Sequence, residues 1–380
     1  MKVVVIIPTY NERENILILL NKLAEVFKGI KHHELSYLVI DDTSPDGTGD
    51  VVKTYMRAHR NVHIISGKRE GLGKAILRGM TEAFEHMGAD AILQMDADLS
   101  HDPLVAPKFL EALDKGANFV VGSRYIKGGA IPQNWGLIRK IYSRIGNFIV
   151  RFGLGHLRVH DWTGGYRAYT KKFYDEVHHE LGQYSGYVFQ IAFLHKAIHH
   201  DAILHEVPFH FTDRRFGHSK IAPAEYIFNI YKYIAISRIQ EIVTGSFGKF
   251  LVVGGIGFII NAVFLVVFHN WVHLSAAVSN LIGAAIAIFS NYNLNNIWTF
   301  KESKIAGIGA YLIKLVQFYV TSAFGVIVIQ TGTIAIGVRL FGDKRYFLYF
   351  LIGTTLLLIW NYIMYSRVIW KKPKRAHEKT

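Results

Sequence analysis

The 380-residue chain contains no cysteine. Disulfide bonds and thiolate metal sites are therefore excluded, and any bound metal ion must use oxygen or imidazole ligands. A secretory signal is also missing, because Pro8 ends the first apolar run before it is long enough for one. We therefore expect the N-terminal part to stay in the cytoplasm.

Acidic residues are scarce in the last third of the chain. Residues 246–380 contain 13 Lys and Arg against three Asp and Glu, and this excess makes up most of the net charge of +14. The same third is the most apolar part of the sequence. The positive charge therefore indicates a membrane surface as partner, and not nucleic acid.

Short apolar runs alternate with helical patterns in the first part of the chain. Runs bounded by turn residues predict buried strands at 3–7, 37–40, 62–66, 91–95 and 119–122, and residues 204–211 are also strand-like. Apolar residues at helical spacing predict helices between them, at 16–27, 74–87 and 103–115. This alternation predicts β-α-β units in a mainly parallel sheet, with ligands at the carboxyl ends of the strands.

Two aspartates, Asp96 and Asp98, follow the predicted strand at 91–95. Mg²⁺ and Mn²⁺ take oxygen ligands and leave positions for water and phosphate, so the pair suits the binding of a nucleotide diphosphate. By itself an Asp-x-Asp pair more often marks a solvated turn. Its neighbours at other strand ends support the metal interpretation: Tyr10, Asp41 and Lys68.

Two helical segments, 137–152 and 224–243, carry apolar residues on one side and basic residues largely on the other. Either could be a core helix. Basic residues beside a broad apolar face, shortly before apolar spans, favour the membrane interface.

Beyond residue 245 the sequence is typical of a membrane protein. Four stretches approach the length of about 20 residues that a bilayer requires, at 250–268, 274–298, 315–338 and 347–370. Lysines follow the second and fourth stretches, which predicts that both termini are cytoplasmic, although Arg339, Lys344 and Arg345 weaken this prediction. Four asparagines could line a polar path, but hydrogen bonds between helices are the favoured interpretation for Asn291, Asn293, Asn295 and Asn296.

Five motifs occur in order along the first part of the chain: Ile7 to Glu12 (IPTYNE), Asp41 to Thr48 (DDTSPDGT), Gly71 to Ala75 (GLGKA), Met95 to His101 (MDADLSH) and Gly122 to Tyr125 (GSRY). Together they resemble the dolichyl-phosphate mannose synthases of glycosyltransferase family 2 over about residues 2–221. The four apolar stretches resemble the GtrA-like membrane domain that is fused to some of these enzymes.

The resemblance implies a fold class and a domain division. The expected architecture is an α/β, Rossmann-like GT-A catalytic domain at 1–221, with an interfacial helix at 137–152. An interfacial amphipathic helix or linker would follow at 222–245. A GtrA-like domain of four transmembrane helices would complete the chain at 246–380.

The resemblance also implies residue roles. Tyr10 would stack on the base and Glu12 would accept from ribose or base, although Glu12 could simply place negative charge at a helix N-terminus. The implied nucleotide-sugar contacts are Pro8, Tyr10, Glu12, Val39, Asp41, Lys68, Asp96, Ala97, Asp98, Arg124, Arg214 and Lys220.

Three further groups of residues are implied. The metal ligands would be Asp96, Asp98 and Ser100, the last a neutral and weaker ligand than a carboxylate. The catalytic group would be Asp96, Asp98 and Arg124. The acceptor phosphate would meet Arg124, Arg139, Arg214 and Lys220, while residues 161–167 would shape the acceptor site.

The implied reaction is metal-dependent transfer of mannose from GDP-mannose to dolichyl or another polyprenyl phosphate, with Mg²⁺ or Mn²⁺. A lipid phosphate is already anionic near neutral pH, so no general base is required, and direct attack predicts an inverted, β-linked product for protein glycosylation. Two alternatives stay open: the same chemistry with UDP-glucose, or a non-catalytic protein that binds nucleotide-sugar or moves lipid-linked sugar. The membrane domain could anchor the enzyme, bind the prenyl tail or move the product.

Overall fold

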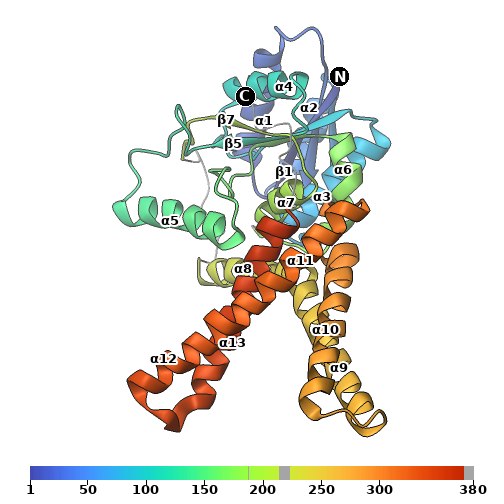
Figure 1. Cartoon of the computed structure of the whole chain (residues 1–380). Coiled ribbons are helices and arrows are strands. Elements are labelled where there is room, and N and C mark those ends of the chain that lie inside the picture. Colours follow the sequence, from blue (N-terminus) through green and yellow to red (C-terminus); the bar gives the residue numbers. More distant parts are fainter. Residues whose placement is uncertain (187, 214–222, 372–380) are drawn as a thin grey trace. The chain divides into compact units, whose positions relative to one another are not determined.

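The computed structural model of the protein describes residues 1–186, 188–213 and 223–371. Arg214 and Lys220, which the sequence assigned to phosphate binding, lie outside the described residues. The chain forms two compact units, Met1–Arg238 and Ile239–Thr380 (Figure 1).

The first unit is built on a sheet of seven strands in the part of the chain that the structure describes. The strands follow the order β3-β2-β1-β4-β6-β5-β7, and β6 alone among them runs antiparallel to its neighbours β4 and β5. The mainly parallel sheet is therefore confirmed, and β6 is an addition to the prediction. The strands are β1 (Lys2–Thr9), β2 (Glu34–Asp41), β3 (Val62–Ser66), β4 (Ala91–Gln94), β5 (Phe119–Ser123), β6 (Arg167–Thr170) and β7 (Leu204–Pro208).

Both faces of this sheet are buried, which explains why the strands are apolar throughout. Successive side chains of a strand point to opposite faces, so Val5 packs in one core layer and Ile6 in the other. The layer around Val5 receives α1 (Arg13–Phe27), α2 (Thr48–Met56) and α4 (Ala106–Asp114). The layer around Ile6 receives α3 (Leu72–Thr81), α6 (Lys171–Val177) and α7 (Val188–His199). Short helical turns complete this unit: η1 (Glu82–His86), η2 (Pro103–Val105) and η3 (His178–Glu180).

Two longer helices leave wide apolar faces uncovered. Helix α5 (Leu137–Leu154) exposes 74% of Leu137 and 70% of Phe152, while Val150 and Leu154 are buried in the layer around Ile6. Helix α8 (Pro223–Thr244) exposes 65% of Phe228, and its Ile234 enters the same layer. The predicted helices are confirmed, and their interfacial placement stays a prediction.

The second unit is helical in its described residues. Its elements are α9 (Ser246–Asn270), α10 (Ala276–Leu294), η4 (Asn295–Thr299), η5 (Lys301–Ser303), α11 (Ile308–Phe324), η6 (Gly325–Gln330), α12 (Thr331–Phe341), η7 (Asp343–Arg345), α13 (Tyr346–Met364) and η8 (Tyr365–Ile369). Within the described residues, three helical stretches are long and apolar enough to cross a bilayer: Ser246–Asn270, Ile308–Phe341 and Leu348–Ile369.

The predicted span at 274–298 is not among those three stretches. It corresponds to α10 and η4, whose asparagines lower the hydropathy that a span requires. Two of these asparagines bond to later helical segments, since Asn293 Oδ1 accepts from the Tyr311 hydroxyl at 2.9 Å and Asn296 Oδ1 from Trp370 Nε1 at 2.9 Å. Interhelical hydrogen bonding is therefore confirmed for Asn293 and Asn296, and the count of four spans is not.

Candidate active site

Strand direction brings the polar motifs to one edge of the sheet. The carboxyl ends of β1, β2, β4 and β5 lie there. Strand β1 pairs in parallel with β2 and β4, and β5 runs in the same direction as β4 because both are antiparallel to β6. The first residue of β6, Arg167, pairs with Gln94 at the end of β4. Asp41, the last residue of β2, and the loops that carry Asp96 and Arg124 therefore lie at the same edge of the sheet, as predicted.

The acidic pair lies in a tight turn directly after β4. Asp98 Oδ1 accepts from the main-chain N–H of Ser100 at 3.1 Å, and Leu99 between them has a φ of 63°. Residues other than glycine seldom adopt this left-handed conformation, so the turn requires stabilising contacts from other parts of the chain. Thr212 holds it: its hydroxyl donates to the Leu99 carbonyl at 3.0 Å and its N–H donates to the Ser100 carbonyl at 3.2 Å.

His101 fixes the first aspartate. Its Nδ1 accepts from the main-chain N–H of Asp96 at 3.0 Å, so the ring proton must be on Nε2, which lies 3.8 Å from Asp96 Oδ2. The His101 ring is buried and stacks on Tyr166, with ring centroids 4.9 Å apart and planes 10° from parallel. No role was predicted for His101, although it is the last residue of the MDADLSH motif.

The donor set suits a hard divalent cation. The side chain of Asp96 is 38% exposed, whereas Asp98 and Ser100 are buried. Oxygen ligands of this kind favour Mg²⁺ or Mn²⁺ over softer metals. The two carboxylates therefore fit the implied metal, and the place of Ser100 in the ligand set stays a prediction.

Arg124, directly after β5, forms a two-pronged ion pair with Asp161. The Arg124 Nε and Nη2 atoms lie 2.6 and 2.7 Å from the two carboxylate oxygens, and Nη2 also donates to the Thr163 hydroxyl at 2.8 Å. Burial raises the pKa of Asp161, but the charge and hydrogen bonds of Arg124 outweigh burial and lower it overall. The guanidinium is thus held in one orientation at the sheet edge, which preorganises it for an anion.

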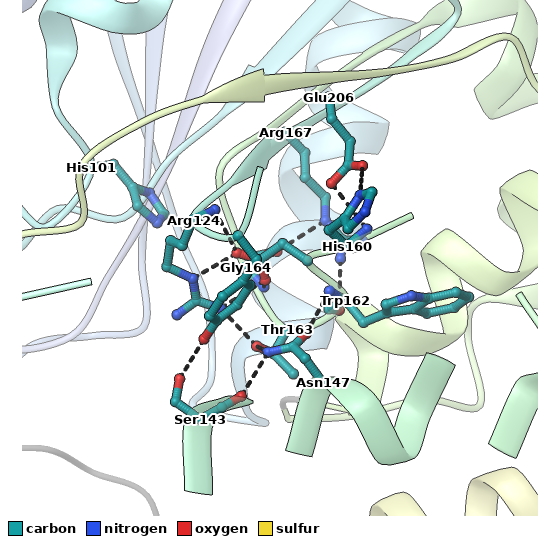
Figure 2. A network of polar contacts seen from close by, with 12 residues as sticks. His101, Arg124, Ser143, Asn147, His160, Trp162, Thr163, Gly164, Arg167 and Glu206 are labelled. Carbon is teal, nitrogen blue, oxygen red and sulfur yellow. Dashed lines mark hydrogen bonds and ion pairs between the residues drawn. The ribbon is translucent and has the colours of Figure 1, made fainter. Parts of the chain in front are cut away.

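The segment around Asp161 is tied to α5 and to β7. Asn147 of α5 accepts from Trp162 N–H at 2.8 Å and donates to the Thr163 hydroxyl at 3.4 Å (Figure 2). From β7, Glu206 accepts from the main-chain N–H of His160 at 3.1 Å. The helix with the exposed apolar face and the arginine at the sheet edge therefore share one hydrogen-bond network.

The predicted nucleotide residues of the first motifs are engaged with the protein itself. The Arg69 guanidinium lies 4.0 Å from the centroid of the Tyr10 ring, and Glu12 accepts from the Asn15 amide at 2.8 Å. Asp41 accepts from the hydroxyls of Thr9 at 3.2 Å and Ser44 at 2.5 Å. The Thr9–Asp41 contact joins the ends of β1 and β2, and the Arg69–Tyr10 contact joins the loops after β3 and β1. A nucleotide role for Tyr10, Glu12 and Asp41 stays a prediction.

The remaining predicted residues differ in accessibility. Lys68 is exposed and Pro8 is half-buried, so both offer surface to a ligand. Ala97 is buried beside the acidic pair and Val39 exposes no surface, and a nucleotide contact of either residue stays a prediction.

Arg139, the predicted acceptor-phosphate contact on α5, already has two partners. It forms an ion pair with Asp213 at 3.3 Å, and its guanidinium lies 3.8 Å from the centroid of a Trp135 ring. Its phosphate contact stays a prediction.

Gln190 on α7 lies close to the acidic pair and is not among the residues predicted from the sequence. It is 1% exposed, and neither of its amide atoms has a hydrogen-bond partner among the described residues. A Cβ atom placed on Gly165 would lie 3.3 Å from Asp96 Oδ1 and 3.6 Å from Gln190 Nε2, so the amide lies close to the acidic pair across Gly165. A single amide in the apolar run VFQIAFL was the available signal.

Comparison with known proteins assigns the chain to a class. Residues 4–178 match the model of glycosyl transferase family 2, and residues 249–370 match the GtrA/DPMS transmembrane domain. With the mixed α/β sheet and the acidic pair at its edge, the first unit is a GT-A glycosyltransferase domain. The second unit is a membrane domain.

Similar proteins of known activity identify the family within this class. The chain is 32% identical over 375 residues to the dolichol-phosphate mannosyltransferase of Pyrococcus furiosus, covering 97% of this chain and 99% of that protein. It is 37% identical over 226 residues to the polyprenol monophosphomannose synthase of Mycolicibacterium smegmatis, covering 58% of this chain and 81% of that protein. A solved structure of glucosyl-3-phosphoglycerate synthase from Mycobacterium tuberculosis, with Mn²⁺, UDP and product, matches with 18% identity and a TM-score of 0.44 over 63% of this chain and 79% of that chain. The chain therefore belongs to the dolichyl-phosphate mannose synthases of glycosyltransferase family 2 that carry a GtrA-like membrane domain.

Proposed function

We propose that the protein transfers mannose from GDP-mannose to dolichyl phosphate or another polyprenyl phosphate in a metal-dependent reaction. The observation that carries the proposal is similarity to a dolichol-phosphate mannosyltransferase along almost the whole chain, combined with Asp96, Asp98 and Arg124 at one sheet edge. The product would be a β-linked lipid-phosphate mannose that serves protein glycosylation.

The residues of the site divide the chemistry between them. A divalent ion held by Asp96 and Asp98 would offset the negative charge that develops on the leaving diphosphate. Arg124, oriented by Asp161, would place its positive charge against phosphate oxygens at the same edge. The buried Gln190 amide, which lies close to Asp96 across Gly165, would help to position the acidic pair.

The acceptor supplies the nucleophile. An oxygen of the lipid phosphate forms a bond to the anomeric carbon of mannose, while the bond from that carbon to the diphosphate breaks and its electron pair leaves with GDP. Attack opposite the leaving group inverts the configuration. Because the phosphate oxygen is already anionic near neutral pH, the site has to orient it and does not have to deprotonate it.

The apolar faces of α5 and α8 support a lipid acceptor. Exposed residues such as Phe152 and Phe228 suit the boundary between headgroups and acyl chains, where a polyprenyl phosphate presents its phosphate. Both helices share the core layer around Ile6 with the sheet. Anchoring at the bilayer surface would thus bring the sheet edge to the acceptor, with both termini in the cytoplasm.

The test uses the full-length protein purified in detergent and returned to lipid vesicles. Labelled GDP-mannose and UDP-glucose are each offered with dolichyl or undecaprenyl phosphate, with Mg²⁺, Mn²⁺ or a chelator. We expect β-linked mannosyl lipid from GDP-mannose, and no product with the chelator. Asp96→Asn should abolish transfer, while Asp50→Asn, a change at an exposed residue of α2, serves as control. Preference for UDP-glucose, or full activity of Asp96→Asn, would overturn the proposal.

A further inference from the structure

Three imidazole rings meet where the end of α5 approaches α7. His156 follows the C-terminus of α5, and His195 and His199 lie one turn apart on α7. One ring nitrogen from each histidine lies within 4.8 Å of the other two, and the Nε2 atoms of His195 and His199 are 3.1 Å apart. The end of α5 and helix α7, which are far apart in the sequence, therefore bring three potential nitrogen ligands together.

The rings are oriented by neighbours on their other sides. The Nδ1 atom of buried His195 lies 2.9 Å from the Tyr233 hydroxyl on α8, which directs Nε2 toward His199. The His156 ring is nearly parallel to Trp162, with centroids 6.2 Å apart and planes at 22°. In histidines that bind metals, the second ring nitrogen commonly has a polar partner, as His195 Nδ1 has in Tyr233, and this partner fixes the tautomer.

The spacing also fits a common ion. Two nitrogens that each bind Zn²⁺ at about 2.0–2.1 Å in tetrahedral geometry lie roughly 3.3 Å apart, close to the 3.1 Å between the two Nε2 atoms. Residues four apart on a helix lie on the same face, which is why His195 and His199 can share one ion. His199 is exposed and His156 is half-buried, so an ion can enter from solvent.

We propose that His156, His195 and His199 form a second metal site, for Zn²⁺ or a similar transition-metal ion, distinct from the carboxylate pair. Three neutral imidazoles favour such ions over Mg²⁺, and a water molecule would fill the fourth position. The ion joins the end of α5 to α7 directly and reaches α8 through Tyr233. It therefore fastens together the two helices whose apolar faces are exposed.

Packing around the site is consistent with a fixed junction of these helices. A Cβ atom placed on Gly153 of α5 would lie 2.7 Å from a methyl carbon of Ile234 on α8, so the two helices cross closely next to His156. The site stands independently of the proposed transferase function, because none of its ligands belongs to the sheet edge.

The test is cobalt spectroscopy on the full-length protein after treatment with a chelator. Tetrahedral Co²⁺ with nitrogen ligands gives strong visible absorption, whereas six-coordinate Co²⁺ on carboxylates and water gives weak bands. We expect strong absorption that saturates at one equivalent in wild type and in Asp96→Asn, and that Zn²⁺ displaces. Zn²⁺ should also raise the melting temperature of wild type.

Variants separate a metal site from a hydrogen-bonded histidine cluster. His199→Ala should weaken Co²⁺ binding by at least about tenfold, and Tyr233→Phe by about ten- to a hundredfold, since outer partners of metal ligands have effects of this size. His200→Ala is the matched control, because His200 neighbours His199 but contacts Glu180 at 2.7 Å instead. Only weak absorption in wild type, or equal binding by the His199 and His200 variants, would overturn the proposal.

Discussion

Asp161 accepts two hydrogen bonds from the guanidinium of Arg124, at 2.6 and 2.7 Å. The side chains are 9% exposed for Arg124 and 0% for Asp161, so water does little to screen the pair. A buried charge without its partner is strongly destabilising. The charge of the buried Arg124 guanidinium is therefore compensated by Asp161, and the loop at residues 160–165 is as important to the site as the strand that ends just before Arg124.

Asp161→Asn removes the charge and keeps the shape. We expect it to lower the free energy of unfolding by about 3–5 kcal/mol, the usual cost of breaking a buried pair, and to reduce sugar transfer. Asp175→Asn is the control, because Asp175 pairs with Lys171 at the surface. Thermal unfolding in detergent measures both variants, and a loss no larger than that of the control would contradict the argument.

The same pair predicts a pH dependence of stability. The pKa of Asp161 is lower in the folded protein than in the unfolded chain, because the effect of Arg124 outweighs that of burial. A lowered pKa contributes stability that is complete above the unfolded value of about 3.9, and this stability is lost as the pH falls through the folded value. The free energy of unfolding should thus decrease below about pH 4, with a shallower slope in Asp161→Asn. Identical slopes would show that other carboxyl groups govern acid unfolding.

His101→Leu tests the support of the acidic pair. The change leaves the Asp96 N–H without its acceptor, which should cost about 1–3 kcal/mol of stability. It should also raise the Mn²⁺ or Mg²⁺ concentration needed for half-maximal transfer more than it raises KM for the nucleotide-sugar, because Asp96 loses its fixed position. His86→Leu, at an exposed histidine paired with Glu82, is the control. An unchanged metal requirement in His101→Leu would remove His101 from the site.

Gln190→Met should separate stability from activity. Methionine has a similar length but no amide, so it removes a buried polar group that has no partner among the described residues. We expect stability to rise by about 1 kcal/mol or more, while kcat/KM for the nucleotide-sugar falls. Gln183→Met, at an exposed residue bonded to Glu180, should change neither. If Gln190→Met were less stable than wild type, the amide would be part of the core and not of the site.

The sequence predicted the parallel strands of the first unit because each is a short apolar run that ends in turn residues. It placed Asp96 and Asp98 correctly at a strand end for the same reason. Strand β6 escaped prediction: its four residues include Arg167 and Thr170, so neither an apolar run nor an alternating pattern marks it. Its place between β4 and β5 depends on tertiary packing.

The partners of the site residues were also beyond a single sequence. Arg124 and Asp161 are separated by 37 positions, and either could have faced solvent. Their pairing depends on how Asn147 and Glu206 anchor the loop at residues 160–165. In the second unit, the predicted span at 274–298 is not among the three stretches that are long and apolar enough to cross a bilayer, because α10 and η4 are rich in asparagine, and it stays a prediction.

The exposed face of α5 gives a test of the membrane interface. Phe148→Glu combined with Phe152→Glu places two charges on side chains that are 59% and 70% exposed, so folding should change little. If this face enters the headgroup region, transfer to a long polyprenyl phosphate in vesicles should fall by about tenfold or more, because charge opposes burial of the helix face. Transfer to a short, water-soluble prenyl phosphate should persist, since that acceptor reaches the site from solution. Phe148→Leu with Phe152→Leu keeps the face apolar and should retain both activities. Equal losses with both acceptors would mean that α5 acts on Arg124 through Asn147 and Thr163, and not by contact with lipid.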